Sequence, residues 1–302
     1  MYVITGASGN VGNIVARKLL AAGQQVRVIG RSADRLQPLA DSGAEAFVCD
    51  LTDTEALTKA FTGTRAVYAM IPTEVTSQDY RAYQDRVTDA IATAIEKAKV
   101  EYVVSLSSIG ADKSERNGPI AGLHYLEQRL NEISGLNALH LRCGYFMENT
   151  LEQIGIIKAM GAAADSLHPD LKVPMIATRD IGTTVAEALL SLDFNGKQTR
   201  ELPGQRDISL AEATATIGKA IGKPELTYVQ LPDEQLRAAL IQHGMSPNVA
   251  DLILEMSAAL NSGHIVALEK RAAENTAATS YETFVAEEFV PRYQGKSTSA
   301  AH

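Results

Sequence analysis

Residues 1–12 read MYVITGASGNVG, and they indicate the class of fold before any other part of the chain does. An apolar run at residues 2–4 leads into three glycines, after which apolar residues recur at helical spacing. We predict a strand, a tight turn and a helix, which is the context that a dinucleotide-binding turn requires. Gly6 would allow the turn, Gly9 would let the backbone approach a pyrophosphate, and Gly12 would let the helix pack against the strand.

The helix after this turn offers a place for the phosphates. Its first backbone N–H groups have no partner within the helix, and the positive end of the helix dipole favours an anion. The spacing is G-x-x-G-x-x-G rather than the commoner G-x-G-x-x-G, so an ordinary strand-to-helix turn is the alternative. The predicted contacts of this turn with the dinucleotide are Gly6, Ser8, Gly9, Asn10, Val11 and Gly12.

The composition is that of a globular protein without an excess of positive charge. The 302 residues are 45% hydrophobic and 21% charged, which suits one large or two smaller domains with a substantial core. The formal net charge is −8, and because nucleic-acid binding needs clustered Lys and Arg, we expect no nucleic-acid partner. The two cysteines, Cys49 and Cys143, fit neither a disulfide framework nor a zinc site, so we expect buried thiols and no metal.

No segment is typical of a membrane-bound or secreted protein. The first strand is expected at residues 2–4, which leaves no room for a signal peptide, and no apolar run approaches the roughly 20 residues that cross a bilayer. We therefore expect a cytoplasmic protein with no membrane partner. The sequence leaves both a monomer and a homodimer open.

The residues after the second predicted strand, 25–29, favour one cofactor. An NAD site commonly has Asp or Glu here, about 20 residues beyond the glycines, to accept the ribose hydroxyls. This chain instead has Arg31 and, one helical turn later, Arg35. Guanidinium groups suit a 2′-phosphate because their planar fork makes paired, charge-assisted hydrogen bonds to it. NADP(H) is therefore favoured over NAD(H), and the alternative is that both arginines are solvated surface charges.

Further site residues are expected at the carboxyl ends of the later strands, where doubly wound sheets bind their ligands. These strands are predicted at residues 44–49, 66–71, 102–106 and 137–141. A serine at a strand end often only satisfies local backbone groups, which is the alternative for Ser107. We expect Asp50 and Leu51 beside the adenine, Met70, Ile71 and Pro72 near the nicotinamide ribose, and Ser107 in the wall of the site.

We therefore predict an α/β protein with a doubly wound parallel Rossmann sheet and a smaller C-terminal α+β domain. The Rossmann domain would span residues 1–149, completed by part of 173–192, and the smaller domain would take most of 150–302. The pattern also predicts a lid or cleft lining at residues 150–160, a loop at 162–172, and a helix to residue 190 that Asp180 caps.

Several segments spread over the chain match the pattern of one known family. They are TGASGNVG at 5–12, Arg31, Asp50-Leu51, His124 with Glu127 and Leu130, Ser134-Gly135-Leu136, LRCGYFMEN at 141–149, TRDIG at 178–182, Leu202-Pro203-Gly204 and Ile208-Ser209-Leu210. Together they resemble the NmrA-like atypical short-chain dehydrogenase/reductases, most closely the branch of NAD(P)H quinone oxidoreductases and triphenylmethane reductases. The glycine turn occurs in many reductases, whereas the His124–Glu127 and 141–149 segments are more specific.

The resemblance implies a Rossmann domain whose cleft, at the nicotinamide, is closed by the smaller domain. It also implies that Gly144, Tyr145, Phe146 and Asn149 form the wall against the nicotinamide. Members of the family either reduce small electrophilic molecules with NADPH or, as NmrA does, bind the dinucleotide without turnover and regulate a protein partner. Both functions stay open at this point.

One motif of the standard short-chain dehydrogenases is missing. Those enzymes use Tyr-x-x-x-Lys, in which the lysine lowers the tyrosine pKa so that the phenol can protonate a carbonyl oxygen. Here Tyr125 is followed four residues later by Arg129, which cannot be tuned as a lysine can. A quinone needs less acid catalysis, because an electron-poor acceptor mainly requires positioning and stabilisation of negative charge. We therefore expect a quinone or a similar small electron acceptor.

Two residues are candidate hydrogen-bond donors to the oxygen of that acceptor. They are His124 and Tyr145. The alternative for His124 is a hydrogen-bonded histidine on a helix face, because no charged partner is assigned to it. The alternative for Tyr145 is a residue of the nicotinamide wall.

Overall fold

Seven parallel strands form one sheet in the computed structural model, which describes residues 1–296. The chain runs outward from the central strand β1 in one direction and then returns to β4 on its other side. The strand order therefore reverses between β1 and β4, and such a switch point is where doubly wound sheets bind ligands. In spatial order the strands are β10 (Lys197–Leu202), β6 (Asn137–Cys143), β5 (Tyr102–Ser108), β4 (Ala66–Ala69), β1 (Tyr2–Ile4), β2 (Val26–Gly30) and β3 (Glu45–Val48).

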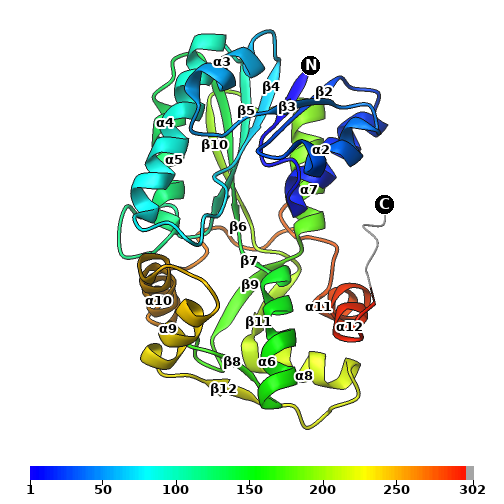
Figure 1. Ribbon diagram of the computed structural model, residues 1–302, viewed down its shortest axis with the longest axis vertical. Coiled ribbons are helices and arrows are strands. Elements are labelled where there is room, and N and C mark those ends of the chain that lie inside the picture. Colours follow the sequence, from blue (N-terminus) through cyan, green and yellow to red (C-terminus); the bar gives the residue numbers. More distant parts are fainter. Residues whose placement is uncertain (297–302) are drawn as a thin grey trace.

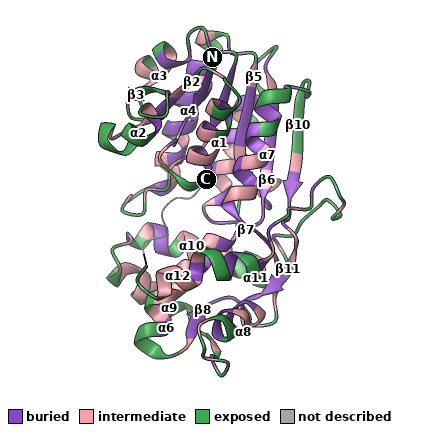
Figure 2. Ribbon diagram, turned by 90° about the vertical axis from the view of Figure 1, so that its right-hand side faces the viewer, coloured by how far each residue is buried: buried purple, intermediate pink, exposed green. Residues whose placement is uncertain are grey.

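Helices cover both faces of this sheet (Figure 1). One face packs against α1 (Asn10–Ala21), α2 (Ala33–Ala40) and α7 (Thr178–Ser191), and the other against α3 (Thr54–Phe61), α4 (Tyr80–Ala98) and α5 (Ile120–Asn131). Burial on both sides explains why β1 and β4 are apolar throughout, and the inner strands are coloured as buried in Figure 2. The predicted doubly wound Rossmann sheet is confirmed. Across residues 1–296, no helix is both long and apolar enough to cross a lipid bilayer.

A smaller part follows β6 and has its own core (Figure 1). It contains a three-stranded sheet in the order β11-β9-β7 and a β12-β8 pair. Its strands are β7 (Tyr145–Phe146), β8 (Ala163–Asp165), β9 (Lys172–Ile176), β11 (Arg206–Ser209) and β12 (Tyr228–Gln230), and its helices are η1 (Met147–Glu152), α6 (Gln153–Met160), α8 (Leu210–Ala220), α9 (Asp233–Gln242), α10 (Pro247–Asn261), α11 (Tyr281–Phe284), η2 (Val285–Phe289) and α12 (Val290–Tyr293).

The second half of the chain departs from the sequence prediction in its long-range pairings. Residues 162–172, predicted as a loop, contain β8, because β8 pairs with a strand that comes much later in the chain. The sequence predicted that part of residues 173–192 completes the Rossmann domain. The structure adds the later strand β10, which pairs with β6 at the edge of the sheet. Residues 150–160 form the end of η1 and α6. They do not line the cleft described below, so the prediction that they form its lining was wrong.

Asp180 does not cap its helix. The residue at the N-cap position of α7 is Ala177, and Asp180 lies in the first turn. Its carboxylate accepts hydrogen bonds from the backbone N–H and the hydroxyl of Thr279, at 3.1 and 2.9 Å. The carboxylate therefore ties the chain before α11 to α7, a contact that no local pattern indicates.

The buried His140 makes the stability of the fold sensitive to acid. Its Nδ1 lies 2.7 Å from Ser105 Oγ and its Nε2 lies 2.9 Å from Asn131 Oδ1, and burial lowers its pKa to about 4. The unfolded chain, with a histidine pKa near 6.5, binds the proton more readily, so this contribution to stability is complete above about pH 6.5 and is lost as the pH falls toward 4. When the pH is lowered from 7 to 5, the free energy of unfolding of the wild-type protein should fall by about 2 kcal/mol more than that of the His140→Gln variant. Urea denaturation at both pH values measures the difference. An equal loss in both proteins would contradict this assignment.

Candidate functional site

The glycine turn has the close contacts expected of a dinucleotide-binding turn. Gly6 has a φ of +59°, in the left-handed region that favours glycine. A Cβ on Gly12 would lie 2.5 Å from Gly6 O and 2.9 Å from Ala7 Cα, so only glycine lets α1 pack on the turn. A Cβ on the exposed Gly9 would meet only Gly6 O, at 3.3 Å. Within residues 1–296, the backbone N–H groups of Asn10, Val11 and Gly12 make no hydrogen bond, and they are available to an anion.

The two arginines after β2 are exposed beside this turn, but their surroundings differ. Arg31 forms an ion pair with Glu74, with 3.2 Å between Arg31 Nη1 and Glu74 Oε2. Among the described residues the Arg35 guanidinium has no ion-pair or hydrogen-bond partner, although the Arg35 backbone N–H donates to Ser32 Oγ. Burial alone would raise the pKa of Asp50, but hydrogen bonds from Thr52 and the nearby Arg31 charge lower it overall. The ribose end of the site thus holds both cations and carboxylates.

Two neighbouring residues predicted at the site point elsewhere. The Leu51 side chain is buried in the core that packs against α3, α4 and α5. Pro72 is half-buried and does not line the cleft, unlike Met70 and Ile71. Met70 reaches back to the turn, because its Sδ lies 2.5 Å from the place where a Cβ on Gly6 would be.

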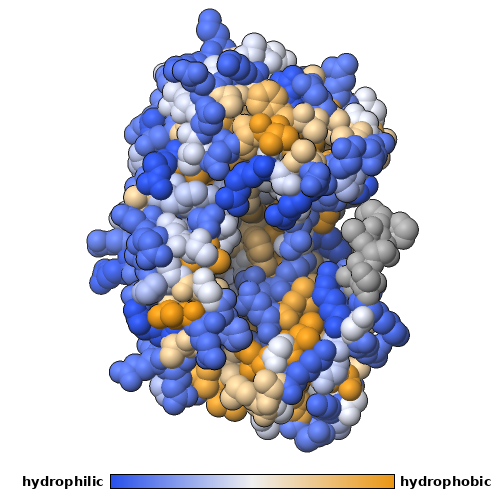
Figure 3. All heavy atoms as spheres, in the orientation of Figure 1, coloured by the Kyte–Doolittle hydropathy of each residue, from blue (hydrophilic) through white to orange (hydrophobic). Residues whose placement is uncertain are grey.

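A cleft of about 620 Å³ lies between the sheet and the smaller part, and Figure 3 shows a hollow near the middle of the molecule with apolar residues inside it. Its walls are mainly apolar, which is typical of a site for a small organic ligand. Of the predicted residues it brings together Met70, Ile71, Ser107, Gly144, Tyr145, Phe146 and Asn149. Residues that the sequence did not single out for the site complete it: Thr73, Tyr80, Gln84, Leu106, Ser108, Ile109, Pro119, Ile120, Leu123, Cys143, Leu171, Lys172, Val173, Pro174, Asp207, Met256, Leu260, Gly263, Ile265, Val266 and Ala267.

A buried ion pair holds the floor of this cleft. The Glu127 carboxylate accepts hydrogen bonds from Arg142 Nε and Nη2, at 2.9 and 2.6 Å, and from Ser107 Oγ, at 2.5 Å. Glu127 is 2% exposed, and its hydrogen bond raises the pKa of Arg142. Ser107 lines the cleft, but its hydroxyl proton is donated to the Glu127 carboxylate. The Ser107 oxygen can therefore accept a hydrogen bond from a ligand but does not donate one in this arrangement.

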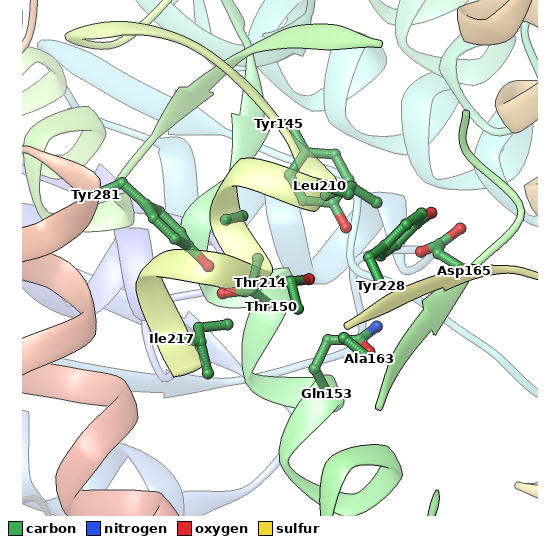
Figure 4. A pocket seen from close by; sticks show the side chains of 11 residues that line it. Tyr145, Thr150, Gln153, Ala163, Asp165, Leu210, Thr214, Ile217, Tyr228 and Tyr281 are labelled. Carbon is green, nitrogen blue, oxygen red and sulfur yellow. The ribbon is translucent and has the colours of Figure 1, made fainter. Parts of the chain in front are cut away.

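The Tyr145 ring lines the cleft, but its hydroxyl points into a separate interior cavity (Figure 4). That cavity measures about 10 Å³, roughly the space of one water molecule, and its wall includes Asp165, Tyr228 and Tyr281. Burial and the neighbouring Asp165 carboxylate raise the pKa of Tyr145 well above its usual value. The Tyr145 hydroxyl is therefore turned away from the space where a substrate would lie.

The other candidate donor also lies outside the cleft. His124 is on α5, half-buried, with Nδ1 2.8 Å from the carbonyl oxygen of Ala111. It is not one of the residues that line the cleft. This hydrogen bond fixes the imidazole to the backbone, which is the structural alternative considered for this residue.

The surroundings of the two cysteines favour the neutral thiol. Cys143 is buried and lines the cleft, while Cys49 is half-buried, so only one of the two expected buried thiols is fully buried. Burial raises the pKa of the Cys49 thiol to about 11, helped by Asp53 and Asp50, and burial also raises that of Cys143. Among the described residues, no group of His, Cys, Asp and Glu side chains could hold a metal ion.

This geometry agrees with the comparison against protein families. A model of the NmrA-like family matches residues 2–290. The chain belongs to the NmrA-like family. The match runs through the glycine turn, the Glu127 and Arg142 pair and the smaller part, so membership does not rest on the turn alone.

Two of the relatives similar to this NmrA-like chain are named as reductases. It is 28% identical over 260 residues, 85% of this chain and 86% of the other, to an NAD(P)H azoreductase of Xenophilus azovorans. It is 27% identical, over 87% and 88% of the two chains, to a (4-alkanoyl-5-oxo-2,5-dihydrofuran-3-yl)methyl phosphate reductase of Streptomyces griseus.

Solved structures share the fold of this NmrA-like chain. An NADPH-dependent quinone oxidoreductase of Escherichia coli complexed with NADPH has a TM-score of 0.80 at 23% identity, covering 97% of this chain and 100% of the other. The triphenylmethane reductase of Citrobacter complexed with NADP(H) has a TM-score of 0.78 at 17% identity, covering 96% and 100%.

In this NmrA-like chain, Tyr125 comes nearest to the Tyr-x-x-x-Lys pattern, but its hydroxyl is hydrogen-bonded away from the cleft. Tyr125 donates a hydrogen bond to Asp89 Oδ1 at 3.0 Å and is not one of the residues that line the cleft. Changing Tyr125 to Phe should therefore leave the rate of NADPH-dependent reduction within a few-fold, whereas loss of a general acid would cost about a hundredfold or more. Steady-state NADPH oxidation by both proteins measures the difference. A hundredfold loss with unchanged NADPH affinity would show that Tyr125 acts in catalysis.

Proposed function

We propose that this protein is an NADPH-dependent oxidoreductase that transfers hydride to a quinone or a similar small electrophilic acceptor. The observation that carries the proposal is the cleft of about 620 Å³, whose walls are mainly apolar and whose floor lies at the carboxyl edge of the sheet, beside the switch point. The names of the relatives support the class of reaction, and the nicotinamide cofactors bound in structures with the same fold support NADPH. The proposal places the acceptor over the nicotinamide, between the sheet and α10.

The cofactor would extend from the ribose end to the cleft. We assign the pyrophosphate to the turn at residues 6–12, the 2′-phosphate to Arg31 and Arg35, and the adenine to the chain at Asp50. We assign the nicotinamide half to the inner end of the cleft. Its wall there would consist of Met70, Ile71, Ser107, Gly144, Tyr145, Phe146 and Asn149.

The bound cofactor would supply the hydride, and the chain would position the acceptor. The apolar walls exclude water and hold a flat ring against the nicotinamide. Neither the Tyr145 nor the Ser107 hydroxyl presents a proton to this space, and Tyr125 does not line it, which supports an acceptor that needs little acid catalysis. Asn149 and Lys172 are among the residues that line the cleft, and both are exposed. Their polar ends would stabilise negative charge as it develops on the acceptor.

A turnover assay tests this function. NADPH oxidation would be followed with a panel of quinones, azo and triphenylmethane dyes, and aldehydes. We expect steady turnover with quinones or dyes and little with aldehydes, which need a proton donor at the carbonyl oxygen. Tight NADPH binding without turnover on any acceptor would contradict the proposal and support a dinucleotide sensor that regulates a protein partner.

If Arg31 binds the 2′-phosphate, reversing its charge should reduce the preference of the protein for NADPH over NADH. Arg31→Asp should weaken NADPH binding by about 1–3 kcal/mol, because a charged hydrogen bond is lost and a repulsion is gained. NADH binding should change far less, since NADH has no 2′-phosphate. Calorimetric titration of both cofactors measures the difference, with Arg237→Asp as the control at an exposed ion pair on α9. The assignment would be contradicted if the wild-type protein bound NADH as tightly as NADPH and if Arg31→Asp left NADPH binding unchanged.

A further inference from the structure

The loop after β4 places a carboxylate on the arginine that would bind the 2′-phosphate. Glu74 Oε2 lies 3.2 Å from Arg31 Nη1, and Glu74 Oε1 accepts a hydrogen bond from Thr76 Oγ1 at 2.6 Å. The hydrogen bonds from Thr76 and Arg31 lower the pKa of Glu74, so this carboxylate is ionised at neutral pH. A 2′-phosphate that reaches Arg31 therefore meets a guanidinium that already has an anionic partner.

The position of Glu74 is fixed by its surroundings and does not depend on Arg31 alone. The neighbouring Val75 carbonyl accepts a hydrogen bond from the Ser246 backbone N–H at 2.8 Å, and the Ser77 carbonyl accepts one from Ser246 Oγ at 2.5 Å. Ser246 is the N-cap residue of α10, so the smaller part holds this loop in place. The Glu74 carboxylate would stay near the ribose even when Arg31 turns toward a phosphate.

A fixed carboxylate has opposite effects on the two cofactors. It competes with the 2′-phosphate dianion for Arg31 and repels it, which weakens NADPH binding. It can accept a hydrogen bond from the free 2′-hydroxyl of NADH, as the acidic residue of NAD sites does. The residue directly after β2 is Arg31 rather than an acid, and Glu74 supplies a carboxylate beside it from the loop after β4.

We propose that Glu74 determines cofactor preference by opposing Arg31. The protein would then bind both NADH and NADPH, and it would favour NADPH by less than its arginines alone would give. The inference rests on the proposed function, because it assumes that the dinucleotide lies along this edge of the sheet. It adds a specificity-determining residue that lies 43 positions from its partner in the chain.

The Glu74→Gln variant tests the proposal, because it removes the charge and keeps the shape of the side chain. We expect NADPH to bind about three- to tenfold more tightly and NADH about threefold or more weakly, so that the ratio of the two dissociation constants shifts by about tenfold or more. Calorimetric titration with NADPH and NADH measures both constants. The matched control is Glu45→Gln, because Glu45 forms an ion pair of similar length with Arg27 at the start of β2 and β3, away from their carboxyl ends.

The outcomes separate this inference from the proposed function. A ratio that moves by less than twofold in Glu74→Gln, while both cofactors still bind, would overturn the role of Glu74 and leave the reductase function intact. Wild-type protein that binds neither cofactor would overturn both. An equal shift in Glu45→Gln would show a general effect of net charge and would also overturn the specific role of Glu74.

Discussion

Replacing Gly9 with valine is expected to abolish dinucleotide binding and turnover while the protein stays folded. A side chain at Gly9 would meet only one protein atom within 4 Å, Gly6 O at 3.3 Å, and would otherwise extend into open space at the N-terminus of α1. That space is where a pyrophosphate would approach the backbone, so the valine would exclude the ligand without disturbing the core. Titration with NADPH, together with a circular dichroism melt, measures both effects.

Gly12→Val is the matched comparison for this variant. A Cβ there would lie 2.5 Å from Gly6 O and 2.9 Å from Ala7 Cα, so α1 would have to move away from the turn. We expect this variant to lose stability as well as binding, by several kcal/mol or by failure to fold. Unchanged NADPH affinity in Gly9→Val would show that the turn is an ordinary strand-to-helix connection.

Replacing Glu127 with leucine is expected to destabilise the protein by about 3–5 kcal/mol. The change removes the partner of the partly buried Arg142 guanidinium and of the Ser107 hydroxyl, and an uncompensated buried charge is costly. Because both partners support the cleft floor, turnover should fall as well. Urea denaturation at pH 7 measures the loss of stability.

Two further variants show whether the unpaired charge is the cause. The double variant Glu127→Leu with Arg142→Leu should recover part of the lost stability, because no charge is then left without a partner. Gln128→Ala changes an exposed residue on the same helix and should lie within about 0.5 kcal/mol of wild type. A double variant less stable than the single one would mean that Arg142 has other essential contacts.

The features that the sequence predicted well depend on residues that are close together in the chain. The glycine turn at residues 6–12 follows from local backbone geometry, because its left-handed and closely packed positions exclude a Cβ. The alternation of buried strands and amphipathic helices likewise follows from periodicity, and it was enough to predict the doubly wound sheet. The exact edges of strands and the extension of the sheet by β10 were not predicted, because they depend on which strands pair.

The sequence by itself thus determined the class of fold and the glycine turn after β1, because short-range sterics and hydrogen bonding are encoded within a few consecutive residues. Only the tertiary structure decided that residues 256–267 close the cleft, that the Tyr145 hydroxyl points away from it, and that Glu74 pairs with Arg31. Those contacts join segments that are distant in the chain. Their geometry is fixed by the packing of the whole molecule, since a side chain takes the direction that its buried neighbours leave open.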